Sequence, residues 1–198
     1  MTDGLLEIPM SIVSQTNRLP AEFAVFLVKP EEQEMLVEQV TQTIESTLRQ
    51  CPGFVSGSVI CSRDGLRVTS YVQWANQASY VATQPIANFE PPDVHLFEIF
   101  EAEPKGSELH LATGMDGLIN FGIFKMKQPE NQPRFIELFK QALNMVSGQP
   151  GLISTHAHRS LDGWRCINFG YWRSLEDYTL VVQKSPESLM HRESHNET

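Results

Sequence analysis

The chain has 198 residues, of which 41% are hydrophobic and 20% charged, and this composition is typical of a globular protein. Its formal net charge of −9 at pH 7 argues against nucleic acid and anionic membrane surfaces as partners, because both would repel it. The sequence has no run of about 18 apolar residues and lacks the basic start of a secretory signal, so we expect a cytoplasmic protein. Its three cysteines show no Cys-x-x-Cys spacing and fit a reducing compartment.

The first strand and helix are predicted from residues 23–53. Residues 23–28 form a continuous apolar run that ends before Pro30, which indicates a buried strand. Apolar residues then recur at helical spacing from Leu36 to Cys51 and predict an amphipathic helix. Pro52-Gly53 would end this helix, because glycine readily adopts the left-handed conformation that follows a helix C-terminus.

A hairpin, a helix and a last strand are predicted next. Residues 54–61 and 66–74 form two strands around a turn at Ser62–Gly65. Asn76 can cap a second helix that runs toward Thr83, and residues 94–100 alternate enough to form a fourth strand. The order is β-α-β-β-α-β, so we expect the α+β class and the ferredoxin-like arrangement.

The same landmarks recur 98 residues later, so the chain is predicted to contain two copies of one unit. We place the copies at residues 1–117 and 118–198, the first with a preceding strand and a following linker. Residues kept in both copies are expected to serve the fold, and residues found in one copy can serve a site. The matching landmarks are Pro52-Gly53 with Pro150-Gly151, Asp64-Gly65 with Asp162-Gly163, Trp74 with Trp172, and Tyr80 with Tyr178.

The second copy differs from the first at its end. Its second helix begins with Ser174–Asp177, which has the form of a capping box. Only a polar tail follows that helix, where a fourth strand is expected. An uncovered sheet edge favours aggregation, so we predict that Ile8–Val13 or another segment completes the edge of the second copy.

The combination of Pro-Gly after the helix, Ser-x-Asp-Gly in the hairpin, and a Trp followed six residues later by a Tyr resembles one family. It is similar to the antibiotic biosynthesis monooxygenase (ABM) domain of the dimeric α+β barrel superfamily, here in tandem. In that family two ferredoxin-like sheets pack face to face, usually between two chains. The resemblance implies that one chain makes this pairing as an intrachain pseudo-dimer, which can itself form a homo-oligomer.

The resemblance also implies an activity and a site. The family contains oxygenases that convert aromatic anthrones to quinones without a cofactor, and it contains heme-degrading enzymes. For this chain it implies a small aromatic substrate, O₂ and no cofactor. The second copy matches the quinone-forming branch at its catalytic positions, whereas the first copy keeps only the Trp and the Tyr. The implied catalytic residues are His158, Asn168, Trp172, Tyr178 and Arg192, and the implied substrate-binding residues are Trp74, Tyr80 and His156.

The face on which the two histidines lie depends on the second hairpin. If residues 161–163 form a three-residue loop, His156 and His158 share the face of Asn168 and Trp172. A two-residue loop would move both histidines to the other face. We favour the three-residue loop, because it also groups the apolar residues of the first hairpin on one side. His158 would then serve as a base or proton shuttle, since imidazole titrates near neutral pH.

Other functions remain open from the sequence. Both tryptophans can be core anchors, and Asn168 can simply satisfy backbone groups. The protein can therefore be a small-ligand-binding or assembly module without chemistry. Heme degradation is disfavoured, because both copies lack the axial histidine expected in or after the second helix. His156-x-His158 has no nearby third ligand, so we expect no metal site.

Overall fold

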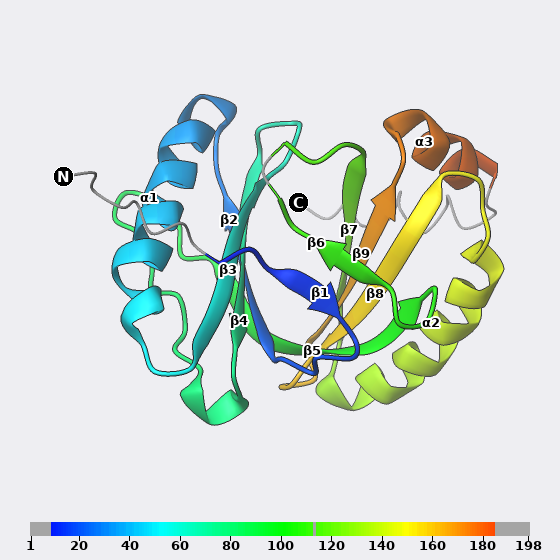
Figure 1. Ribbon diagram of the computed structural model, residues 1–198, viewed down its shortest axis with the longest axis horizontal. Coiled ribbons are helices and arrows are strands. Elements are labelled where there is room, and N and C mark those ends of the chain that lie inside the picture. The colour runs from blue at the N-terminus through cyan, green and yellow to red at the C-terminus, as the bar shows by residue number, and fades with distance from the viewer. Residues whose placement is uncertain (1–8, 113, 185–198) are drawn as a thin grey trace.

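The computed structural model describes residues 9–112 and 114–184, in which seven strands form one antiparallel sheet (Figure 1). In space the strands follow the order β3-β4-β2-β5-β8-β9-β7. The sheet is bent like a U, with the first three strands on one side, the last three on the other and β5 across the bottom. The strands are β2 (Ala21–Leu27), β3 (Phe54–Cys61), β4 (Arg67–Trp74), β5 (Asp93–Glu103), β7 (Leu118–Lys125), β8 (Leu152–Ser160) and β9 (Arg165–Trp172).

The ferredoxin-like fold and the pairing of two repeats within one chain are confirmed. Strands β5, β2, β4 and β3 lie in the ferredoxin order, and β8, β9 and β7 repeat three strands of that order. Strand β5 pairs with β2 along one edge and with β8 along the other, so it belongs to both halves of the sheet. The division at residues 117 and 118 stays a prediction.

Helices cover the outer faces of both halves of the sheet. Helix α1 (Gln33–Ser46) lies outside the first half, and α2 (Gln132–Val146) and α3 (Leu175–Lys184) lie outside the second (Figure 1). Leu36, Val40 and Ile44 of α1 are fully buried in a core that includes Val72 and Trp74 of β4. Burying each of these aliphatic side chains stabilises the fold by about 2 kcal/mol.

The space between the two halves is filled by aromatic side chains. Phe23 packs edge to face against Tyr71 and Phe97, with ring centroids 4.9 and 5.0 Å apart. Phe169 of the second half lies 6.1 Å from both Phe23 and Tyr71. The two sheet halves therefore share one apolar interior, as the small size of each repeat requires.

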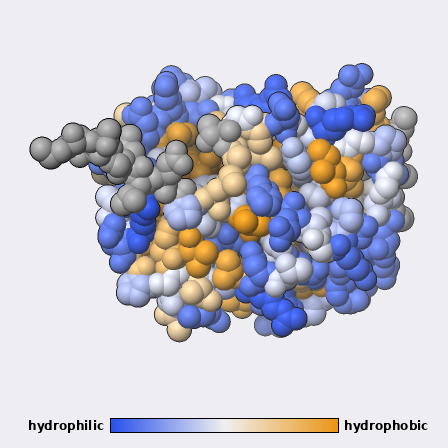
Figure 2. Space-filling view, viewed as in Figure 1, coloured by the Kyte–Doolittle hydropathy of each residue, from blue (hydrophilic) through white to orange (hydrophobic). Residues whose placement is uncertain are grey.

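A two-stranded ribbon of β1 (Ile12–Ser14) and β6 (Glu108–His110) lies between the two arms of the U in the view of Figure 1. It buries Val13 and Leu109 in the shared interior. On the face that shows the ribbon, apolar residues form small groups between hydrophilic ones (Figure 2). The ribbon thus covers the apolar interior.

The prediction that Ile8–Val13 completes the edge of the second copy is wrong for its described part. Strand β1 pairs with β6, and Ile8 lies outside the described residues. The buried amide of Gln73 explains this position, because it donates to the Ile12 carbonyl and accepts from the Ile12 N–H. Gln73 thereby fixes β1 to the first repeat.

The second helix predicted for the first repeat is also wrong. Asn76 does accept a hydrogen bond from the Ser79 N–H, but the turn it caps is a 3-10 helix, η3, of three residues (Gln77–Ser79). The chain then extends, because the N–H and hydroxyl of Thr83 both bond to the buried carboxylate of Glu22 on β2. Pro85 further disfavours helix at the residue before it.

The 98-residue frame shifts by one within the helical segments. The short 3-10 helices Pro30–Glu32 and Pro129–Asn131 begin 99 residues apart, and so do the helices that follow. A 3-10 turn, Leu48–Gln50, follows α1, whereas no such turn follows α2, and this restores the frame before the Pro-Gly pairs. The second repeat thus has one extra residue before its helix and one fewer between the start of that helix and the Pro-Gly pair. The landmarks on either side of the helix keep the 98-residue spacing and do not reveal this shift.

The shift brings two glutamines to equivalent places. The Gln33 side-chain amide donates to the carbonyls of Ser62 and Arg67, at 2.9 and 3.0 Å. The Gln132 amide donates to the carbonyls of Ser160 and Arg165, both at 2.9 Å. Each glutamine therefore ties the start of its helix to its hairpin.

Gly53 and Gly151 occupy positions that only glycine fits. Their φ angles are +88° and +84°. A Cβ on Gly53 would lie 2.3 Å from the Cβ of Ser79, and a Cβ on Gly151 would lie 2.3 Å from that of Asp177. Both copies therefore keep Pro-Gly for the turn and for the close approach of the following segment.

We expect Gly53→Ala to lower the free energy of unfolding by about 3 kcal/mol, from the strained φ and the clash together. Gly106→Ala is the control, because Gly106 has a φ of +75° and nothing within 4 Å of its Cβ position. It should cost about 1 kcal/mol. Urea denaturation measures both, and equal losses would contradict the role given to the contact with Ser79.

Candidate functional site

The β8–β9 hairpin decides which side chains share a face. The Gly163 N–H donates to the Ser160 carbonyl, as in a type I turn, and Gly163 has a φ of +83°. The Arg165 N–H donates to the Ser160 hydroxyl at 2.8 Å. Residues 161–164 thus form a four-residue loop. The strands pair in the same register that a two-residue loop at residues 162–163 would give, with Arg159 opposite Cys166.

The three-residue loop predicted from the sequence is therefore wrong. His158 lies opposite Ile167, and His156 lies opposite Phe169. Asn168 pairs with Ala157 and so lies on the other face. The physical reason is the Ser160 hydroxyl, which accepts the Arg165 N–H and allows a longer loop. The structure does not bring His156 and His158 together with Asn168 and Trp172.

His156 and His158 lie in the shared interior, and both are fully buried. The His158 ring lies 5.2 Å from Phe23 and 6.2 Å from Phe169. Its Nδ1 donates to the His156 carbonyl, and His156 Nε2 donates to the Ser107 carbonyl. Burial, with a smaller contribution from His156, lowers the pKa of His158 to about 3, so this imidazole stays neutral.

Asn168 and Trp172 lie on the helix-covered face of the second half, four residues apart on β9, and α3 brings Tyr178 against Trp172. The Trp172 indole N–H donates to Asn120 Oδ1 at 2.9 Å, and the Tyr178 ring lies 5.5 Å from the Trp172 ring. Asn168 Oδ1 accepts a hydrogen bond from the Thr155 hydroxyl. No described residue accepts from Asn168 Nδ2, so its half-buried amide can donate to a ligand.

Phenylalanines cover the same face. Phe124 of β7 lies 4.9 Å from Phe135 and 5.6 Å from Phe139, both on α2. Phe100 of β5 lies 6.2 Å from Phe139. All four are only partly buried. An apolar layer with a few polar groups is the usual lining of a small-molecule site, and this layer suits a planar aromatic molecule.

The equivalent layer of the first repeat is more completely buried. Trp74 is fully buried, and its ring lies 6.1 Å from Tyr80. Ser70 occupies the place of Asn168, and Glu22 that of Asn120. Among the described residues, neither Trp74 Nε1 nor Ser70 Oγ has a hydrogen-bond partner. Trp74 therefore acts mainly as a core residue.

Glu22 is a residue that sequence reasoning missed. Its carboxylate is fully buried and accepts from the Thr83 N–H at 2.8 Å, from the Thr83 hydroxyl and from the Tyr80 hydroxyl. Burial raises its pKa, although these hydrogen bonds act in the opposite direction. The feature of the sequence that could have indicated Glu22 is its place directly before the apolar run at residues 23–28.

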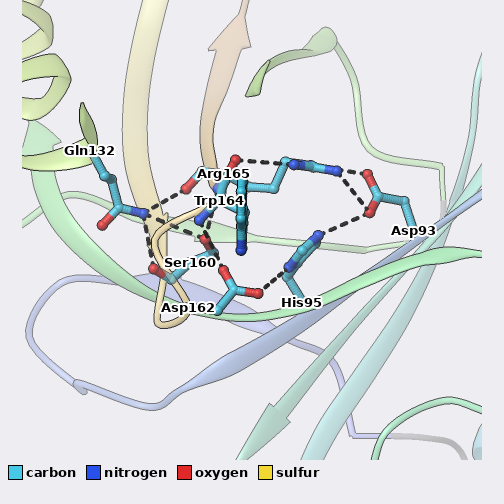
Figure 3. A network of polar contacts seen from close by, with 7 residues as sticks. All are labelled: Asp93, His95, Gln132, Ser160, Asp162, Trp164 and Arg165. Atoms are coloured by element: carbon cyan, nitrogen blue, oxygen red, sulfur yellow. Dashed lines mark hydrogen bonds and ion pairs between the residues drawn. The ribbon is translucent and has the colours of Figure 1, made fainter. Parts of the chain in front are cut away.

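A polar network lies where the two repeats meet (Figure 3). His95 Nδ1 lies 2.6 Å from Asp162 Oδ2, and His95 Nε2 lies 2.9 Å from Asp93 Oδ1. Arg165 donates to both carboxylate oxygens of Asp93. The network links β5 to the β8–β9 hairpin. Sequence reasoning did not assign His95 or Asp93 to a site.

Two further observations concern the described part of the chain. No three His, Cys, Asp or Glu side chains of these residues come close enough to hold a metal ion. None of their helices is long and apolar enough to cross a membrane. Arg192, predicted to be catalytic, lies outside the described residues.

Comparison with known families matches both repeats of the chain. The family described as antibiotic biosynthesis monooxygenase matches residues 21–84 and 122–189, one segment in each repeat. The chain belongs to the antibiotic biosynthesis monooxygenase family. It is 35% identical over 82 residues to tetracenomycin-F1 monooxygenase of Streptomyces glaucescens, a match over 41% of this chain and 73% of that protein.

Two solved structures share the fold. An anthrone oxidase-like protein superposes with a TM-score of 0.74 at 17% identity. The match covers 89% of this chain and 82% of that protein's chain. A putative monooxygenase from Fusobacterium nucleatum gives a TM-score of 0.53 at 12% identity, over 85% and 82% of the two chains. At these identities the similarity shows the fold alone. Together, the family and the curated relative support a monooxygenase-type function.

The buried His158 predicts a pH-dependent stability. Its folded pKa lies below the ordinary 6.5, so the unfolded chain binds the proton more readily. The stability it contributes is complete above about pH 6.5 and is lost as the pH falls toward about 3. From about pH 7 to about pH 5, the free energy of unfolding should fall by about 2 kcal/mol more in the native protein than in His158→Ile.

Isoleucine is the matched replacement, because Ile60 holds this place in the first repeat. His110→Gln is the control, since the His110 side chain is 52% exposed, and it should keep the native pH dependence. Urea titrations at both pH values measure the effect. An unchanged pH dependence in His158→Ile would contradict a neutral, buried His158.

Proposed function

We propose that the protein is a cofactor-independent monooxygenase that oxidises a small aromatic substrate of the anthrone type with O₂. The proposed site is the helix-covered face of the second repeat. The observation that carries the proposal is that Asn168, Trp172 and Tyr178 share the face of the second repeat that the phenylalanines of β7 and α2 also cover. Family membership and the similarity to tetracenomycin-F1 monooxygenase support it.

The reaction needs no external reductant, because the substrate supplies the electrons. The CH₂ group of an anthrone becomes a carbonyl group, one atom of O₂ enters the product and the other leaves as water. The substrate must first lose a proton to give an electron-rich enolate. The protein would stabilise the developing negative charge on the substrate oxygen.

Asn168 and Tyr178 are the proposed donors to that oxygen. The Asn168 amide has no described acceptor. Burial raises the pKa of Tyr178, so its hydroxyl stays protonated and can donate. Trp172, fixed by Asn120, would pack against the substrate ring. The role implied for Arg192 stays a prediction.

His158 could act as the base only if its side chain reached the substrate on this face. The hairpin register places it in the shared interior, and its pKa is far below neutral. We therefore propose that water takes the substrate proton and that His158 contributes to packing.

A second candidate is a small-molecule-binding module without chemistry. The burial of Trp74 favours this function. The first repeat keeps both Trp74 and Tyr80 although Trp74 is fully buried in its core, so this pair of residues can serve the fold alone. Oxygen consumption with an anthrone separates the two functions. Saturable binding of the anthrone without oxygen uptake would support the binding module.

Asn168→Ala should reduce kcat for oxygen uptake with an anthrone by about a hundredfold, because a donor to a developing oxyanion contributes about 3 kcal/mol. Trp172→Phe should also reduce turnover. The matched control is Trp74→Phe, which should retain turnover at a temperature where the variant is folded. Equal losses from the two tryptophan substitutions would refute a single site in the second repeat.

A further inference from the structure

A groove of about 330 Å³ runs along the junction of the two repeats. One wall comes from η3 and Tyr80, the floor from β5 and the opposite wall from the β8–β9 turn. The groove therefore exists only when both repeats are folded against each other. Its lining residues are Gln77, Tyr80, Val94, His95, Leu96, Leu161 and Asp162.

The groove combines apolar walls with hydrogen-bonding ends. Val94, Leu96 and Leu161 are aliphatic, and Tyr80 adds an aromatic ring. Asp162 and the exposed Gln77 belong to opposite walls. A volume of this size lies at the lower end of small-molecule sites. These features suit a fused-ring aromatic molecule.

Asp162 is a fixed carboxylate. Its Oδ1 accepts the Trp164 N–H at 3.0 Å, and its Oδ2 lies 2.6 Å from His95 Nδ1 (Figure 3). Although burial acts in the other direction, the Ser160 hydroxyl, the Trp164 N–H and His95 lower its pKa. The side-chain exposure of 47% leaves room for a ligand donor to approach the carboxylate.

The opposite wall also disfavours an anion. The Tyr80 hydroxyl donates to the buried carboxyl of Glu22, and the negative charges of Glu22 and Asp162 raise the pKa of Tyr80 further than burial does alone. Tyr80 therefore stays a neutral wall residue. With a net charge of −9, the protein as a whole also repels anions.

We propose that this junction groove is a second ligand site, which binds an uncharged fused-ring phenol through its hydroxyl group. The ligand hydroxyl donates to Asp162, and its rings lie between Tyr80 and the aliphatic side chains. Nothing in this binding requires oxidation, so the site stands independently of the function proposed for the second repeat.

Isothermal titration calorimetry with 1-naphthol tests the proposal. Gln77→Trp places a large side chain in the groove and should weaken binding by at least about tenfold. Ala78→Trp is the matched control, because Ala78 lies on the same exposed turn and does not line the groove. It should bind 1-naphthol with the native affinity.

The role of the hydroxyl is tested with 1-methoxynaphthalene, which has no donor, and with 1-naphthoate, which is an anion. Native protein should bind 1-naphthol about tenfold more tightly than either compound. Asp162→Asn should remove most of the preference for 1-naphthol over the ether, while thermal melting checks its fold.

Three results would overturn the proposal. These are no saturable binding of 1-naphthol, equal affinities in Gln77→Trp and Ala78→Trp, or equal affinities for 1-naphthol and its ether in the native protein. A loss in Trp172→Phe without a loss in Gln77→Trp would place the ligand in the second repeat instead. Oxygen uptake with an anthrone is measured separately, so failure of either site is recognised independently.

Discussion

Strand β5 is the element on which the rest of the structure depends, because both of its edges carry hydrogen bonds. It pairs with β2 of the first repeat and with β8 of the second, and so joins the repeats into one sheet. Its pairing with β2 ends at Phe97, where its pairing with β8 begins, and the register with β8 shifts between Ile99 and Glu101. Without this double pairing, the aromatic side chains of the two halves would face water. Neither repeat is large enough to bury them alone.

The bent sheet creates two environments of opposite character. The inner face is filled, and a histidine placed there loses its charge, as His158 does. On the outer face of the second half Asn168 is only half-buried, and no described residue accepts a hydrogen bond from its amide. Successive side chains of β8 and β9 point to opposite faces of the sheet. The position of a residue in the strand therefore decides whether it lies in the buried interior or on the outer face. A shift of one residue would exchange the two environments.

Much of the fold follows from local sequence patterns. Apolar periodicity predicted α1 and strands β2 to β5, and the 98-residue recurrence extended this prediction to the second repeat, whereas β6 was not predicted. The Pro-Gly pairs marked turns that require positive φ at Gly53 and Gly151. The N-cap half of the capping box predicted at Ser174 is confirmed, since its hydroxyl accepts the Asp177 N–H, and the Asp177 carboxylate accepts a hydrogen bond from that same hydroxyl. The grouping of Trp172 with Tyr178 was also predicted through the resemblance. These features depend on residues that are close in sequence.

The predictions that failed depend on single hydrogen bonds of polar side chains. Some of these bonds join residues far apart in the chain, and one sets the length of a hairpin loop. The Ser160 hydroxyl set the hairpin register, and Thr83 reached Glu22 instead of continuing a helix. Gln73 fixed the first strand to a place that hydrophobic patterns do not specify. Apolar periodicity cannot show such contacts, because each one is a single pairing of polar groups far apart in the chain.

The duplication explains why the two repeats can carry different sites. Equivalent positions hold Asn120 and Glu22, and the change from amide to carboxyl redirects the local hydrogen bonds. Asn120 fixes the indole of Trp172, whereas Glu22 attracts Thr83 and Tyr80 and leaves Trp74 Nε1 without a described partner. The chain after Tyr80 then lies against the sheet instead of forming a helix. Tyr80 becomes a wall of the junction groove, while Tyr178 stays beside its tryptophan. The difference between Glu22 and Asn120 on the first strand of each unit thus accompanies two different layers, a fully buried one around Trp74 and a partly buried one near Asn168.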